Sequence, residues 1–201
     1  MALPLLGCAP WVSATPGAQS PQRVSRPLMG TQVDIVVDGL DAPLGRHAID
    51  QAYAEMARLE ALLSRYRPDS AVSRISRAAG IQPVEVPPEV MRLLQAAQQM
   101  HGFSGGAFDI TVGSLKGWRF EAGHQAAPSA SEISRQLRRV DARRLVLDER
   151  AGTAYLAEQG MALDLGGIAK LPILEACMQV LRNHGVGHAL INGGGDVLVM
   201  G

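Results

Sequence analysis

The sequence predicts an α+β fold in which a mostly antiparallel sheet is flanked by helices. Apolar residues recur at helical spacing in the longer segments, and short apolar runs separated by Gly, Asp and Glu turns lie between them. The chain has 201 residues, of which 47% are hydrophobic. This length and composition fit one domain, or two small ones, with a core of their own.

Charge and cysteine content exclude several classes of protein. The 19 basic and 19 acidic side chains give no net charge, which argues against nucleic acid as a partner because phosphate backbones are bound by an excess of Lys and Arg. Two cysteines, Cys8 and Cys177, exclude a disulfide scaffold and a Cys-rich zinc site. No apolar run in the sequence reaches membrane-spanning length.

The N-terminal segment differs in composition from the rest. Leu5-Leu6-Gly7-Cys8 resembles a bacterial lipoprotein signal, in which cleavage before the Cys exposes it for lipid attachment. No basic region or longer apolar stretch precedes this Cys, so a plain N-terminal tail is the alternative interpretation. Residues 9–27 have the Ala, Pro and Ser content of an extended tether. We therefore expect residues 1–26, a possible signal remnant and tether, to lie outside the fold.

The first half of the remaining chain predicts a strand and then helices. Residues 32–37 alternate apolar and polar side chains, as in a strand with one buried face, and residues 50–64 carry an apolar stripe at helical spacing. Pro87-Pro88 opens a second helix that Gly102 ends. A third, short helix follows Ser129, with Glu132 completing a capping box.

The second half predicts antiparallel strands around one more helix. Residues 145–147, 153–156 and 161–165 are short apolar runs separated by turn residues. A final helix is expected over residues 172–184, with Cys177 as a buried apolar residue and Gly185 as the stop. Two further runs, 188–191 and 196–200, flank a glycine-rich turn. Because the last run stops in mid-strand, we expect the natural domain to continue beyond it.

Glycine-rich loops beside aspartates are the main candidates for chemistry. In residues 104–111, two glycines precede Asp109, a pattern that is commoner in a turn leading into a strand than in a ligand loop. In residues 163–170, a strand delivers Asp164, two glycines follow, and Lys170 supplies a cation. These parts could form a phosphate and metal site. An ordinary strand-to-helix turn with an exposed Lys fits the same spacing equally well.

Other catalytic patterns do not fit. His184 and His188 are separated by glycines that break a helix, so a zinc pair is not expected. The sequence contains no GxGxxG following a strand, no P-loop and no GxSxG elbow. From spacing alone, the chain is an α+β domain with a candidate phosphate-binding turn.

Five motifs in order resemble those of the ApbE family of flavin transferases. They are Met29-Gly30-Thr31, LSRYRPDS at residues 63–70, SGGAFDITVGSL at residues 104–115, LDLGGIAK at residues 163–170 and ALINGGGDV at residues 189–197. The resemblance implies a magnesium-dependent enzyme that transfers FMN from FAD to a Thr or Ser of a target flavoprotein and releases AMP. It also implies a lipid anchor at Cys8 and a place on the periplasmic side of the inner membrane.

The resemblance also assigns a flavin pocket, residue by residue. It consists of Met29, Tyr66, Ala107, Phe108, Asp109, Asp164 and Lys170. The apolar and aromatic members can cover rings, the aspartates can accept hydrogen bonds, and the lysine can offset pyrophosphate charge. Gly167 falls where the family offers magnesium a backbone carbonyl.

The chain departs from the family pattern at two places. Leu171-Pro172 stands where the family usually has Gly-Tyr. A later family segment, with a His near a DPRTG stretch and an Asp and Thr that ligate magnesium, does not occur, so residues 27–201 would be the N-terminal part of the domain. Gly167 alone cannot hold magnesium, which leaves open whether this polypeptide is active by itself. The alternatives are an FAD hydrolase that yields FMN and AMP, and an FAD-binding lipoprotein without transferase activity.

Overall fold

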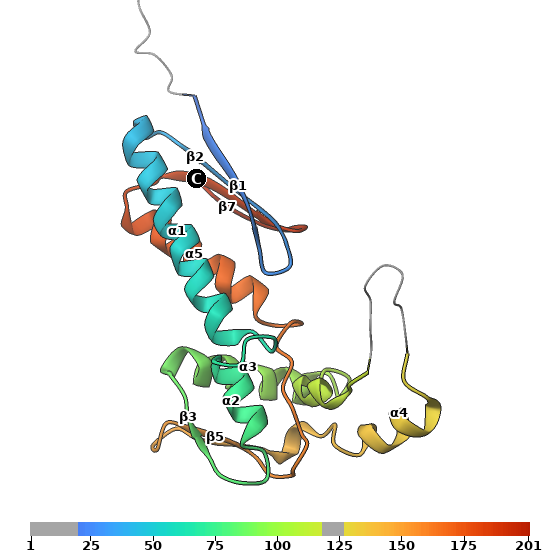
Figure 1. Cartoon of the computed structure of the whole chain (residues 1–201). Helices are drawn as coiled ribbons and strands as arrows, with labels where there is room; N and C mark the ends of the chain where they lie inside the picture. Colours follow the sequence, from blue (N-terminus) through green and yellow to red (C-terminus); the bar gives the residue numbers. More distant parts are fainter. Residues whose placement is uncertain (1–19, 118–126) are drawn as a thin grey trace, which may run out of the picture.

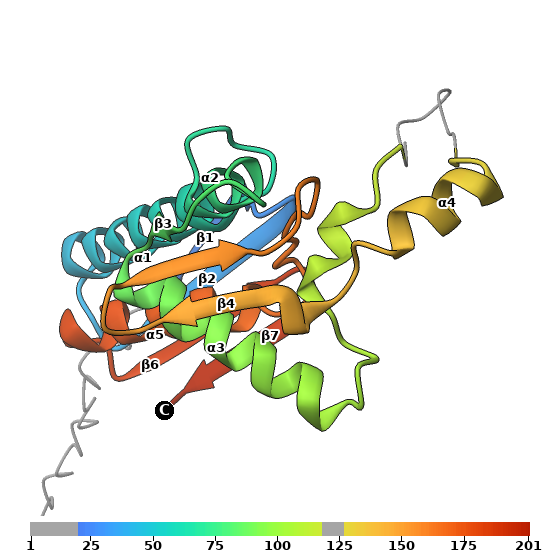
Figure 2. The same cartoon turned by 90° about the horizontal axis from the view of Figure 1, so that it is seen from below.

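The structure, a computed structural model, describes residues 20–117 and 127–201. It contains a four-stranded sheet of order β1-β2-β6-β7 and a three-stranded sheet of order β3-β5-β4, with helices packed against them (Figures 1 and 2). All neighbouring strands in both sheets are antiparallel, which confirms the predicted fold class. The elements in chain order are β1 (Gln22–Leu28), β2 (Thr31–Asp38), α1 (Ala42–Leu63), α2 (Ala71–Arg77), β3 (Val84–Glu85), α3 (Pro88–Phe103), η1 (Ile110–Ser114), α4 (Ala130–Leu137), η2 (Ala142–Arg144), β4 (Leu145–Asp148), β5 (Thr153–Leu156), α5 (Lys170–Asn183), β6 (His188–Gly193) and β7 (Asp196–Met200).

The four-stranded sheet and two long helices form the first part of the core. α1 and α5 lie side by side against one face of the sheet (Figure 1). Val33, Ile35 and Val37 of β2 point toward these helices and are buried, as the alternation in residues 32–37 predicts. The hairpin of β6 and β7 was also predicted correctly. Among the described residues, no helix is long and apolar enough to cross a membrane.

β1 corrects the expected boundary of the fold. It begins at Gln22 and pairs with β2 along its whole length, so residues 22–26 belong to the sheet rather than to a tether. Val24 and Leu28 pack against the core, while Arg23 and Ser25 on the other face are exposed. Pro27 is tolerated because β1 is an edge strand. The predicted lipidation site, Cys8, lies outside the described residues.

Helices in the first half are longer or more numerous than predicted. α1 starts at Ala42 because the Asp41 side chain caps it by accepting from the Leu44 N–H at 2.9 Å. α2 was not predicted at all; its Ser70 cap accepts from the Ser73 N–H. α3 confirms the second predicted helix. α4 confirms the third together with both bonds of the predicted capping box. α4 buries none of its residues and stands apart from the sheets in both views.

One predicted strand is wrong, and the glycine loop before Asp109 leads into the 3₁₀ helix η1 rather than into a strand. Residues 161–165 form no strand, because their N–H groups bond to neighbouring turns and side chains instead. The Asp164 N–H donates to the carbonyl of Ile110 at 2.7 Å, and the Leu163 N–H donates to Ser76 Oγ at 3.1 Å. The segment that carries Asp164 is therefore fixed between η1 and α2. The runs at β4 and β5 are confirmed as strands.

α5 begins at Lys170 rather than Pro172, and its inner face confirms the expectation for Cys177. The Cys177 side chain is fully buried and its thiol donates to the Ala52 carbonyl, with Sγ 3.3 Å from the oxygen. Burial raises the pKa of this thiol to about 12, because a thiolate would lose its hydration there.

This buried thiol predicts a loss of stability at alkaline pH. An unfolded thiol ionises near pH 9 and the folded one near pH 12, so the free energy of unfolding should fall as the pH rises through this window. Urea unfolding of the chain and of Cys177→Ala at several pH values checks it. Burial also raises the pKa of Tyr53 to about 12, and Tyr53 is present in both proteins. The difference between the two slopes of unfolding free energy against pH therefore gives the contribution of Cys177. Equal slopes would contradict the prediction.

Candidate functional site

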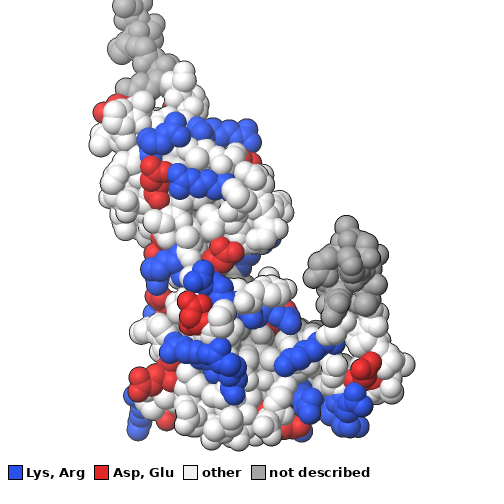
Figure 3. Space-filling view, viewed as in Figure 1, with Lys and Arg blue, Asp and Glu red and all other residues white. Residues whose placement is uncertain are grey.

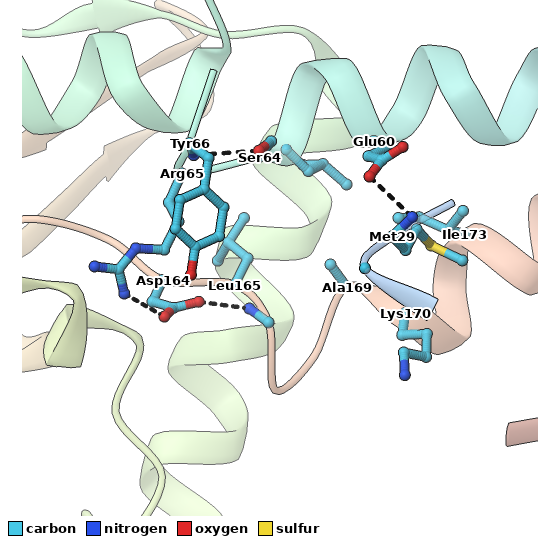
Figure 4. Close-up of a pocket in the computed structure, with 13 residues that line it drawn as sticks. Met29, Glu60, Ser64, Arg65, Tyr66, Asp164, Leu165, Ala169, Lys170 and Ile173 are labelled. Carbon is cyan, nitrogen blue, oxygen red and sulfur yellow. Dashed lines mark hydrogen bonds and ion pairs between the residues drawn. The ribbon is translucent and has the colours of Figure 1, made fainter. Parts of the chain in front are cut away.

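A pocket of about 250 Å³ lies where the end of α1, the β1–β2 turn and the start of α5 meet (Figure 4). Its walls are mainly apolar, with Leu63, Leu165 and Ile173 among them. It is lined by four of the residues that the sequence assigns to flavin binding, namely Met29, Tyr66, Asp164 and Lys170. We call it the first pocket.

Met29 occupies a strained position in its wall. With Gly30 it forms the two-residue turn between β1 and β2, and its φ of 54° lies in the left-handed region. A residue with a Cβ costs roughly 1 to 2 kcal/mol in this conformation. The Met29 N–H donates to the Glu60 carboxylate at 2.9 Å, which fixes the turn against α1 (Figure 4). Such strain at a pocket wall is typical of a functional constraint.

Asp164 is held by bonds to both of its carboxylate oxygens. Arg65 Nη1 donates to Oδ2 at 2.5 Å, and the Gly166 N–H donates to Oδ1 at 2.9 Å (Figure 4). The side chains of Arg65 and Asp164 are 30% and 29% exposed, so the ion pair is partly shielded and still reachable from the pocket. The carboxylate is thus oriented and accessible.

Tyr66 and Lys170 supply the exposed aromatic ring and the cation. Tyr66 is 86% exposed, with the Arg65 guanidinium 5.5 Å from its ring centroid, so a face of the ring is available for stacking. Lys170 stands in the first turn of α5, where the N-cap residue Ala169 makes no side-chain cap bond. A helix N-terminus with a nearby cation favours an anionic group. The Lys170 ammonium lies 3.6 Å from the carboxylate of Asp196.

A second pocket of about 490 Å³ adjoins the first. It is lined by Ala107, Phe108, Asp109 and Gly167, and it shares Asp164 and Gly166 with the first pocket. The structure therefore brings all eight predicted site residues around two adjoining pockets, although the segments that carry them are far apart in sequence.

The carboxylate of Asp109 is engaged within the protein. Oδ1 accepts from the N–H and the hydroxyl of Thr111, and Oδ2 accepts from the Ala142 N–H at 2.8 Å. His101 Nδ1 lies 3.6 Å from Oδ2 and 2.9 Å from the Phe108 carbonyl oxygen. In this structure the Asp109 side chain links the start of η1 to the start of η2. A direct bond from Asp109 to flavin stays a prediction.

The described residues do not by themselves fit a magnesium centre. Gly167 offers one carbonyl, and no group of three or more His, Cys, Asp or Glu residues gathers among residues 20–117 and 127–201. Magnesium requires several hard oxygen ligands. By contrast, apolar walls, an exposed aromatic ring, an oriented carboxylate and a cation are groups that suit a flavin nucleotide.

Sequence reasoning missed the residues that hold this site together. Glu60 fixes the Met29 turn and Arg65 orients Asp164. Both lie on or just after the last turn of α1. Arg65 lies within one of the five motifs, at residues 63–70. Glu60 has no signal that distinguishes it from the other charged residues of an amphipathic helix.

Comparison with known proteins agrees with this arrangement. The ApbE family model matches residues 29–201. The chain belongs to the ApbE family. This confirms the resemblance found in the five motifs.

The relatives are named as flavin transferases. The FAD:protein FMN transferase of Klebsiella pneumoniae (strain 342) is 34% identical over 175 residues, covering 87% of this chain and 54% of that protein. The enzyme of the same name from Treponema pallidum (strain Nichols) is 33% identical over 162 residues, covering 77% of this chain and 44% of that protein. The chain therefore spans about half the length of these relatives.

A solved structure shares the fold. The crystal structure of the ApbE protein from Thermotoga maritima superposes with a TM-score of 0.82 at 27% identity. The superposition covers 90% of this chain and 59% of that one. The two adjoining pockets therefore lie within a fold that this ApbE family member shares.

Proposed function

We propose that this ApbE family chain carries the flavin-binding part of an enzyme that transfers FMN from FAD to a Thr or Ser of a target flavoprotein. The proposal rests mainly on one observation, which is that one pocket is lined by Met29, Tyr66, Asp164 and Lys170. Magnesium dependence and the release of AMP belong to the proposal. The relatives named FAD:protein FMN transferase support the reaction class.

The residues that line the two pockets bind different parts of the FAD substrate. Met29, Tyr66 and Phe108 cover aromatic rings, because their side chains offer apolar or π surface beside the pockets. Asp164, oriented by Arg65, accepts a hydrogen bond from a polar ring edge. Lys170 and the N-terminus of α5 offset the negative charge of the pyrophosphate. When FAD binds, Lys170 leaves the carboxylate of Asp196 and contacts the pyrophosphate instead.

The proposed transfer is a phosphoryl substitution. The acceptor hydroxyl oxygen forms a bond to the FMN-side phosphorus, and the bond from that phosphorus to the bridging oxygen breaks, so AMP leaves with both electrons. The hydroxyl proton passes to a base that we do not assign among the described residues. Magnesium would supply charge neutralisation of the phosphates when bound. We further propose a lipid anchor at Cys8 and a place on the periplasmic side of the inner membrane.

A transfer assay tests this function. The protein that contains this chain, at its full natural length, is incubated with FAD and a candidate acceptor flavoprotein, with and without magnesium. Bound flavin is measured in denaturing gels, and chromatography measures AMP and FMN. We expect acceptor-bound flavin and an equal amount of AMP, only with magnesium. Free FMN without acceptor would favour FAD hydrolysis instead. Binding of FAD with no product in any condition would favour a flavin-binding protein without transferase activity.

A further inference from the structure

A third pocket, of about 440 Å³, lies between α2, the end of η1 and residues 160–163. Its lining includes the basic residues Arg65, Arg77 and Lys116 and no acidic residue. We call it the basic pocket. In Figure 3, Lys and Arg atoms are prominent over the lower part of the molecule, where Figure 1 places α2.

Two of the three cations of the basic pocket are not compensated by a neighbouring carboxylate. Arg65 pairs with Asp164, but Arg77 and Lys116 form no ion pair with any carboxylate of the described residues. Arg77 Nη1 donates to the Pro68 carbonyl, an uncharged group that orients the guanidinium without neutralising it.

The two serine side chains of the pocket are already bonded within the protein. The Ser73 hydroxyl donates to the Arg65 carbonyl, and the Ser76 hydroxyl donates to the Val72 carbonyl while accepting from the Leu163 N–H. The side-chain donors left for a ligand are therefore those of the cations and the Tyr66 hydroxyl. Exposed cations gathered without a counter-charge favour an anionic group.

The basic pocket adjoins the first pocket but is separate from the predicted flavin contacts. The two pockets share Arg65 and Tyr66 as a common wall. Of the eight residues that the sequence assigns to flavin and magnesium, only Tyr66 borders the basic pocket. A polypeptide lying across Tyr66 would thus reach both pockets.

We infer that the basic pocket binds an acidic side chain of the acceptor polypeptide, placed near the hydroxyl that receives FMN. This inference rests on the proposed function, because it needs an acceptor to reach the flavin pocket. The positive charge of the pocket selects a carboxylate on the acceptor. Arg65 borders the basic pocket and also bonds to Asp164, so it connects this contact to the wall of the first pocket. The pocket would then contribute to the choice of acceptor.

A peptide-binding measurement tests the inference. The probe is a fluorescently labelled peptide with one Thr flanked by Asp and Glu, and its control has Asn and Gln at those positions. Anisotropy is followed with the chain and with Arg77→Gln, Lys116→Gln and Arg150→Gln. Arg150 is an exposed arginine of the β4–β5 turn, outside the basic pocket, and is the matched control.

We expect the acidic peptide to bind and the amide peptide to bind at least about tenfold more weakly. Arg77→Gln and Lys116→Gln should each weaken the acidic peptide several-fold, and Arg150→Gln should not. High salt should weaken binding to the unchanged chain. Arg77→Gln also removes the bond from Arg77 to the Pro68 carbonyl. Lys116→Gln breaks no such bond, because the Lys116 side chain is exposed and makes no bond within the described residues. Weaker binding in both variants is therefore not explained by loss of the Pro68 contact.

Four results would overturn the inference or separate it from the proposed function. Equal affinity for both peptides, or an equal effect of all three substitutions, would overturn it. Binding of AMP or inorganic phosphate that only Arg77→Gln and Lys116→Gln weaken, without peptide binding, would show a phosphate site instead. An acidic peptide that binds as expected, with no binding of FAD in a parallel titration, would support the basic pocket and contradict the proposed function.

Discussion

Replacing Asp164 by Asn is expected to raise the dissociation constant for FAD by about tenfold or more, because a charge-assisted hydrogen bond contributes roughly 1.5 to 3 kcal/mol. The neutral amide cannot hold Arg65, whose guanidinium lies 2.5 Å from the carboxylate. The bond from Gly166 can persist, since an amide oxygen still accepts. Flavin fluorescence titration measures the change.

Asp148→Asn is the matched control for this experiment. Its carboxylate also accepts from backbone N–H groups in a turn, those of Arg150 and Ala151, but it lies between β4 and β5, outside both flavin pockets. FAD affinity should not change in this variant. A similar loss in Asp148→Asn and Asp164→Asn, or no loss in either, would contradict the assignment of Asp164.

Replacing Gly113 by Ala is expected to lower the free energy of unfolding by about 2 to 3 kcal/mol, at the upper end of the usual cost of overpacking. A Cβ at this position of η1 would stand 2.4 Å from the carbonyl carbon of Leu163 and 2.5 Å from its oxygen. These are backbone atoms and cannot rotate away. The segment that carries Asp164 would have to move from η1, so FAD affinity should fall as well.

Gly102→Ala, near the end of α3, is the control for Gly113→Ala. A Cβ there meets no atom within 4 Å, and alanine favours a helix. Urea denaturation should find this variant as stable as the unchanged chain or slightly more stable. If both variants unfold at the same urea concentration as the unchanged chain, the close packing of η1 on residues 161–165 is not present in solution.

The parts of the fold that were predicted correctly have strong local signals. Period-two alternation identified β2, helical spacing identified α1, α3 and α5, and Ser129 with Glu132 identified the start of α4. β1 was missed because its outward face is polar and it contains Pro27, so its composition resembles that of a tether. Residues 161–165 were wrongly predicted as a strand because a short apolar run cannot show whether a partner strand exists.

The candidate site was predicted from motif resemblance more than from spacing. Spacing alone left Asp164 and Lys170 in an ordinary turn or a phosphate site, without a decision. The contacts that position them depend on tertiary structure, since Arg65 and Asp164 are 99 residues apart and Met29 and Glu60 are 31 apart. A single sequence contains no local signal for such pairs. The exposure of Tyr66 also became visible only with the fold.

Equilibrium titration of the folded chain with FAD, with and without magnesium, tests the central claim most directly. We expect saturable quenching of flavin fluorescence, strongly weakened in Tyr66→Ala. Because Tyr66 is 86% exposed, this change should leave the urea midpoint unchanged. Tyr155→Ala, at a half-buried position of β5 outside the pockets, is the comparison. No saturable binding by a chain that circular dichroism shows to be folded would contradict the claim that these residues form a flavin pocket.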